Sequence, residues 1–168
     1  MKILFVIAKE NFRDEELFHP LKEVNKAGFE AVIASTEKGL CIGSISKTIE
    51  AEISLNKINS DEFDAVVFVG GAGSSIYFDN KKAHEIARKF HAENKPTCAI
   101  CIAPSTLANA GLLKGKKATC YPSQKENLKA KGANYTETNV QVDGNIITAD
   151  GPQSAKEFGK KIVEALSI

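Results

Sequence analysis

One cysteine of this sequence follows a short apolar run and precedes a helix start. The stretch is Ala99-Ile100-Cys101-Ile102-Ala103-Pro104, and proline is typical of the first turn of a helix. A side chain at such a strand-to-helix turn stands exposed, as in a nucleophile elbow. The free N–H groups and the dipole of a helix start favour a thiolate, the reactive form. We predict that Cys101 is the reactive residue; a buried structural thiol is the competing interpretation.

Two further groups could assist this thiol. Gly70-Gly71-Ala72-Gly73 also follows an apolar run directly, and its backbone N–H groups could form an oxyanion hole together with that of Ile102. The glycines lack the GxGxxG and GxxxxGK[ST] spacings, so nucleotide binding is only weakly indicated. Glu15 and Glu16 follow the first apolar run. Acidic residues there usually complement a helix dipole, but one of the two could turn toward the thiol.

Other uses of the same residue types are disfavoured. Cys98 and Cys101 form a CxxC pair, but three residues of extended chain separate Cα atoms by roughly 10 Å. A disulfide needs less than about 7 Å. No second cysteine or histidine pair with ligand spacing accompanies this CxxC, so no metal is expected. None of His19, His84 and His91 is next to Cys101, and no general base is evident.

Alternating apolar runs and helical patterns must position these residues. Runs that are apolar throughout are typical of strands buried on both faces, which predicts a mainly parallel sheet with helices on both faces. In such sheets, sites lie beyond the carboxyl ends of the strands, where the acidic pair, the glycines and Cys101 all fall. The predicted strands are 3–8, 29–34, 64–69, 97–100 and 118–121, with a hairpin over 140–147 that turns at Asp-Gly. The predicted helices are 15–27, capped by Asp14, then 80–92, 104–111 and 154–166.

The composition predicts one globular α/β domain over residues 1–168. Hydrophobic residues make up 43% and charged residues 26%, and the net charge of +1 gives no sign of a nucleic-acid partner. The first apolar run ends at Lys9 after six residues. It is too short for a signal peptide or a membrane span. We therefore expect a cytoplasmic protein with reduced cysteines and no membrane partner.

Four blocks, in order along nearly the whole chain, resemble the ThiJ/PfpI superfamily. They read ILFVIAKENFRDEELFHPL, FDAVVFVGGAGS, AICIAPSTLANAGLLKGKKAT and ITADGPQSAKEFGKKIVEAL. The chain looks closer to the branch of the parkinsonism-associated protein deglycase than to the PfpI peptidases. The resemblance implies a flavodoxin-like three-layer sandwich, a homodimer, and neither a metal nor an organic cofactor.

The resemblance also assigns roles by position. Cys101 matches the reactive cysteine, and Glu16, four residues before Pro20, matches the acid that hydrogen-bonds it. Gly71 and Ile102 match the backbone N–H donors beside the sulfur. The activities that the resemblance implies are glyoxalase-type conversion of methylglyoxal, repair of glycated groups, peptidase activity in the PfpI branch, and oxidation sensing through the same thiol.

The chain departs from the family pattern where proton transfer is expected. PfpI-type members have histidine directly after the cysteine, and Ile102 stands there, which disfavours a peptidase. The deglycase branch has histidine where this chain has Tyr121, which we expect, with Gly70, to line the site. Ala149-Asp150-Gly151 replaces the common serine-arginine-glycine. The scaffold and the thiol are retained, whereas the proton-transfer partners are changed.

Two hypotheses of different classes follow. In the first, the protein is a cofactor-independent enzyme of the glyoxalase or deglycase kind that acts on small aldehydes or glycated groups. In the second, it is a redox-responsive stress protein in which Cys101 is oxidised and no substrate turns over. A class I glutamine amidotransferase shares the elbow, but no His-x-Glu pair lies near the chain end.

Overall fold

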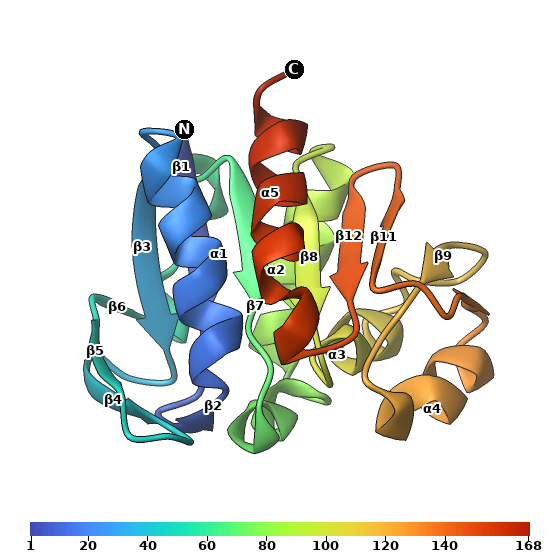
Figure 1. The fold of residues 1–168 in the computed structure, drawn as a ribbon, viewed down its shortest axis with the longest axis horizontal. Coiled ribbons are helices and arrows are strands. Elements are labelled where there is room, and N and C mark those ends of the chain that lie inside the picture. The colour runs from blue at the N-terminus through green and yellow to red at the C-terminus, as the bar shows by residue number, and fades with distance from the viewer.

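A seven-stranded sheet is the centre of the computed structural model, which describes all 168 residues (Figure 1). The strand order is β11-β12-β8-β7-β1-β3-β6. All neighbours are parallel except β11 and β12, which confirms the predicted mainly parallel sheet. The strands are β1 (Lys2–Val6), β3 (Glu30–Ser35), β6 (Ile53–Ser54), β7 (Ala65–Phe68), β8 (Thr97–Ile100), β11 (Val140–Asp143) and β12 (Ile146–Ala149).

Helices cover both faces of this sheet. Helices α1 (Asp14–Lys26) and α5 (Ala155–Leu166) pack side by side on one face, and α2 (Lys81–Ala92) and α3 (Pro104–Asn109) cover the other (Figure 1). The two apolar cores hold 24 and 21 buried residues, so both faces are covered to a similar extent. This is why the central strands are apolar at every position. No helix is both long and apolar enough to cross a membrane.

The predicted capping role of Asp14 is wrong. Asp14 is the first residue of α1, and Arg13 is the residue that caps it, without a side-chain hydrogen bond. The buried Asp14 carboxylate instead accepts hydrogen bonds from the backbone N–H groups of Ile45 at 2.9 Å and Lys47 at 3.0 Å. A turn distant in sequence thus supplies its donors.

The predicted strand 118–121 is correct only at its first residue. Strand β9 (Lys117–Ala118) pairs with β10 (Asn134–Tyr135), and the chain then leaves the ladder. The N–H of Thr119 donates to Thr148 Oγ1 at 3.0 Å, and that of Tyr121 donates to the Cys101 carbonyl at 2.8 Å. After Ala118, hydrogen bonds to Thr148 and to the Cys101 turn therefore replace strand pairing.

Several short elements, within residues 36–63 and elsewhere, are not predicted by apolar runs. Strands β2 (Glu10–Phe12), β4 (Gly39–Gly43) and β5 (Thr48–Ala51) form a separate three-stranded sheet. Only one face of β4 is buried, because Cys41 points inward between exposed Leu40 and Ile42. The remaining elements are α4 (Lys125–Ala130) and the 3-10 helices η1 (Leu55–Lys57), η2 (Ser60–Glu62), η3 (Ala72–Tyr77), η4 (Pro122–Gln124) and η5 (Pro152–Ser154).

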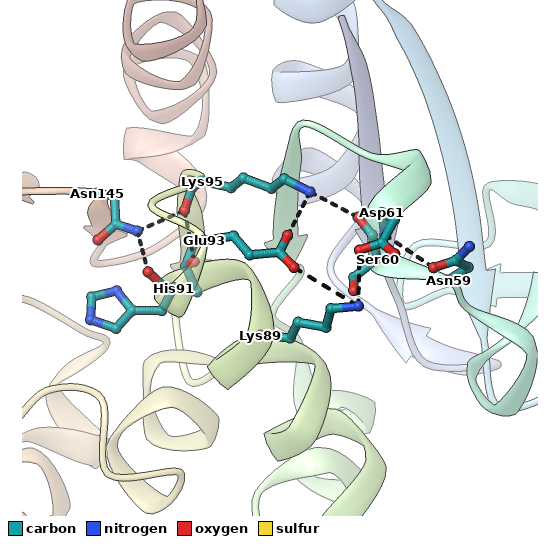
Figure 2. Close-up of polar contacts among 9 residues, drawn as sticks. Asn59, Ser60, Asp61, Lys89, His91, Glu93, Lys95 and Asn145 are labelled. Carbon is teal, nitrogen blue, oxygen red and sulfur yellow. Dashed lines mark hydrogen bonds and ion pairs between the residues drawn. The ribbon is translucent and has the colours of Figure 1, made fainter.

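A polar network ties the end of α2 to the β11–β12 turn (Figure 2). The turn places Gly144, at a φ of 60°, and Asn145 between the paired strands. Asn145 Nδ2 donates to the carbonyls of His91 at 3.2 Å and Lys95 at 2.8 Å. Beside it, Lys89 Nζ forms an ion pair with Asp61 Oδ1 at 2.9 Å on the surface. The amide of Asn145 thus adds a second hydrogen bond to each carbonyl, since that of His91 also accepts from Asn94 N–H and that of Lys95 from Thr97 Oγ1.

We predict that Asn145→Ala lowers the free energy of unfolding by about 1–3 kcal/mol, because two hydrogen bonds to half-buried carbonyls are lost. Lys89→Ala removes only solvent-screened ion pairs, with Asp61 and Glu93, and should cost less than Asn145→Ala. Urea denaturation of both variants measures the difference. An equal or larger loss for Lys89→Ala would contradict the assignment.

Candidate functional site

Cys101 occupies a strained turn between β8 and α3. Its φ of 66° lies in the left-handed region, which costs a residue with a Cβ on the order of 1–2 kcal/mol. Two backbone hydrogen bonds hold the turn: Cys101 N–H donates to the Ala149 carbonyl at 2.9 Å, and Tyr121 N–H donates to the Cys101 carbonyl at 2.8 Å. The sharp turn predicted from the sequence is present, and strained backbone of this kind is typical of functional sites.

Gly70, at the end of β7, permits Glu16 and Cys101 to approach each other. A Cβ added to Gly70 would lie 2.5 Å from Glu16 Oε1 and 2.6 Å from Cys101 Cβ. The next residue, Gly71, has a φ of 100°, and its N–H, like that of Ile102, lowers the pKa of the Cys101 thiol. The Gly70 carbonyl accepts from Arg13 N–H at 3.0 Å, which fixes the strand end to the start of α1. Glycine is therefore required at position 70 because a side chain would overlap its neighbours, and at position 71 because the backbone has a positive φ.

Glu16 is the acid that faces the thiol. Its side chain is fully buried, and neither carboxyl oxygen has a hydrogen-bond partner of ordinary geometry. Burial raises the pKa of Glu16 to about 8, although interactions with Cys101 and Arg13 lower it. The carboxyl therefore keeps its proton at neutral pH. A neutral carboxyl can donate a hydrogen bond from one oxygen and accept at the other.

The Cys101 thiol is less acidic than the helix start alone would make it. Burial, and repulsion from an ionised Glu16, raise the pKa of Cys101 to about 12, against the lowering effect of the Gly71 and Ile102 N–H groups. The thiol is only 8% exposed, and the six-residue α3 does not offset the loss of hydration. Repulsion from Glu16 acts only when that carboxyl is ionised, so at neutral pH burial is the main obstacle to the thiolate.

A depression of about 690 Å³ opens above the thiol. Cys101, Gly71, Ile102 and Tyr121 line it, as expected for four of the candidate residues, whereas Glu16 and Gly70 lie beneath its floor. Its polar side chains come from Arg13, Ser44, Ser75, Tyr121, Ser123, Gln124 and Gln153. Sequence reasoning missed all of these except Tyr121, because their segments carry no recognisable motif.

The histidines and the other cysteines lie away from this depression. None of the three histidines lines it, and His84 Nε2 is instead 2.7 Å from the Phe78 carbonyl. All four cysteines are free and buried, including Cys98. No group of three or more histidine, cysteine or acidic side chains is placed to hold a metal ion. Among the cysteines and histidines, only Cys101 therefore lines the depression.

A cysteine on a strand-to-helix turn beside a buried glutamate, in a parallel sheet between two helix layers, defines a class of α/β proteins with a nucleophile elbow. A family model described as the DJ-1/PfpI family matches residues 1–165, and the chain belongs to that family.

Individual relatives agree with this assignment. An uncharacterized protein of Methanocaldococcus jannaschii is 44% identical over 98% of this chain and 82% of its own length. A protein of Pyrococcus furiosus named deglycase PfpI is 37% identical over 99% of both chains. The crystal structure of a ThiJ/PfpI domain protein from Brachyspira murdochii superposes with a TM-score of 0.97, at 33% identity, over 99% of this chain and 96% of that one.

The raised pKa of Glu16 predicts a pH-dependent stability. Between the ordinary value of 4.5 and about 8, the folded chain holds a proton that the unfolded chain has released. The contribution of Glu16 to stability is therefore fully present below pH 4.5 and is lost as the pH rises through 8. The loss is at most about 1.4 kcal/mol per pH unit. Urea denaturation across this range should give a declining profile for wild type and a flatter one for Glu16→Gln.

The exposed Glu126 provides the control, since Glu126→Gln should retain the wild-type slope. Parallel profiles for wild type and Glu16→Gln would show that the buried carboxyl does not hold the proton.

Proposed function

We propose that this protein is a cofactor-independent enzyme of the glyoxalase or deglycase kind, which acts on small reactive aldehydes or glycated groups. The observation that carries the proposal is the unpartnered, buried Glu16 carboxyl beside the Cys101 thiol. Membership of the DJ-1/PfpI family and the relative named deglycase support it. A peptidase is disfavoured, since Ile102 stands where PfpI-type members have histidine.

The first step forms a hemithioacetal. The Cys101 sulfur bonds to the aldehyde carbon, the π bond of the carbonyl breaks, and the thiol proton ends on the carbonyl oxygen. Glu16 relays that proton: one carboxyl oxygen accepts it from sulfur while the other donates its own to the new alkoxide. The carboxyl is unchanged at the end, so no separate histidine base is needed for this step. The N–H groups of Gly71 and Ile102, which lower the pKa of the thiol, would stabilise negative charge as it develops.

We predict that wild type converts methylglyoxal to lactate and that Cys101→Ser reduces the rate to background. Glu16→Gln, which cannot relay the proton, should lower kcat/KM by about 10²–10⁴-fold. For wild type, kcat/KM should fall as the pH rises through about 8, because the ionised carboxyl no longer donates a proton. Lactate measured over time tests each point, and Cys41→Ser, a change to a buried thiol outside the depression, is the control.

A redox-responsive role is the second candidate, favoured by the backbone donors around the sulfur. Peroxide would add oxygen atoms to Cys101, and the N–H groups of Gly71 and Ile102 could bind them. Absence of lactate from wild type, together with a mass gain of two oxygen atoms on Cys101 in mild peroxide, would reject the enzyme and support this role. A Cys98–Cys101 disulfide in place of oxygen addition would count against this redox role, which would then have to rest on the CxxC pair.

We also propose that the chain is a homodimer, as the resemblance implies, and that it is a cytoplasmic protein. The protomer mass is 18.1 kDa, and sedimentation velocity at micromolar concentration should give a species of twice that mass. A single monomeric species that persists at high concentration would reject the dimer.

A further inference from the structure

Gln124 lies in the wall of the Cys101 depression, where η4 ends and α4 begins. Its Oε1 accepts a hydrogen bond from Ser105 Oγ at 2.7 Å. Ser105 is fully buried on α3, one helical turn beyond the cysteine. The side chain of Gln124 is therefore anchored to the helix that follows the reactive thiol.

A chain of hydrogen bonds decides which end of the Gln124 amide is engaged. It starts at the backbone carbonyl of Phe78, which can only accept, and which binds Asn109 Nδ2 at 3.1 Å. Asn109 Oδ1 must then be the acceptor for Asn127 Nδ2, at 3.0 Å. Asn127 Nδ2 also donates to Ser105 Oγ at 3.0 Å, so the hydroxyl hydrogen of Ser105 is left for Gln124 Oε1. Reversing the Asn109 or the Asn127 amide would set two carbonyl oxygens against each other.

The amide of Gln124 thus has its oxygen occupied and one of its two hydrogens free. One N–H donates to the exposed Ser123 Oγ at a long 3.3 Å, and no other protein acceptor engages Nε2. The nitrogen is the end available to a ligand in the depression. A neutral donor held in a fixed orientation favours an oxygen acceptor and binds it with little loss of side-chain entropy.

The rest of the wall also favours a ligand rich in oxygen. Its polar side chains are hydroxyls, amides, a phenol and the Arg13 guanidinium, with no carboxylate among them. The volume of about 690 Å³ falls in the range of pockets that bind drug-sized ligands, far above what a three-carbon aldehyde fills. A longer substrate with hydroxyl groups would use both the space and the donors.

We propose that Gln124 is a specificity-determining residue whose Nε2 donates to a chain oxygen of the carbonyl substrate, so that hydroxylated 2-oxoaldehydes bind better than methylglyoxal. This inference rests on the proposed addition of Cys101 to aldehydes, and it names the substrate class. Ser105 acts as a positioning residue, because it holds the amide with its nitrogen toward the depression.

The test compares two 2-oxoaldehydes with the same reacting group, methylglyoxal and the six-carbon, hydroxylated 3-deoxyglucosone. Each protects Cys101 from iodoacetamide by forming the hemithioacetal, and peptide mass spectrometry of the Cys101 alkylation rate gives its apparent Kd. Wild type should show the lower Kd for 3-deoxyglucosone. Gln124→Leu should reduce that preference by about threefold to tenfold, the effect of one neutral hydrogen bond.

Ser105→Ala, which leaves Gln124 in place but releases its amide, should reduce the preference by a smaller factor. Gln141→Leu, the same change on β11 outside the depression, should leave it unaltered. A preference that stays at the wild-type value in both Gln124→Leu and Ser105→Ala would overturn the inference while the proposed function stands. Failure of both compounds to protect Cys101 in wild type would instead reject the proposed function, and the inference with it.

Discussion

The close approach of Glu16 and Cys101 past Gly70 is the constraint on which the rest of the site depends. The two side chains come from α1 and from the turn after β8, and the end of β7 runs between them. Only a residue without a side chain fits at that point, because a Cβ would overlap both partners. The contact removes the carboxyl from water, and this desolvation gives Glu16 its raised pKa. The absence of a side chain at Gly70 therefore sets both the close approach of Glu16 to Cys101 and the protonation state of Glu16.

The parallel sheet brings these groups to one edge. Strands β1, β7 and β8 are adjacent and run in the same direction, so the segments after their carboxyl ends converge. The turn at Cys101 is then held from outside the strand, by the carbonyl of Ala149 and the N–H of Tyr121. Strain at a φ of 66° persists because neighbouring segments satisfy its backbone groups. The network at Asn145 secures the opposite end of the sheet (Figure 2).

Burial also explains how the site differs from a simple cysteine elbow. A helix start favours the thiolate. At the almost fully buried Cys101, however, the thiolate loses more hydration free energy than the start of the six-residue helix α3 supplies. A thiol that keeps its proton needs a proton acceptor at the moment of attack, and a neutral carboxyl that both donates and accepts serves that purpose without histidine. The proposed mechanism follows from this balance, and it differs from that of a hydrolase with a cysteine–histidine pair.

The sequence by itself determined the sheet class, the positions of most core strands and helices, and the turn at Cys101, because continuous apolar runs and a helix-starting proline act locally. It also placed Glu16 at the site, through the family pattern. Only the tertiary structure decided the donors of Asp14, the early end of β9 and the three-stranded sheet around β4, since their hydrogen-bond partners lie far away in the chain. The same holds for the pKa of Cys101 and for Gln124: burial and a directed chain of hydrogen bonds are properties of the packed molecule, which no local pattern encodes.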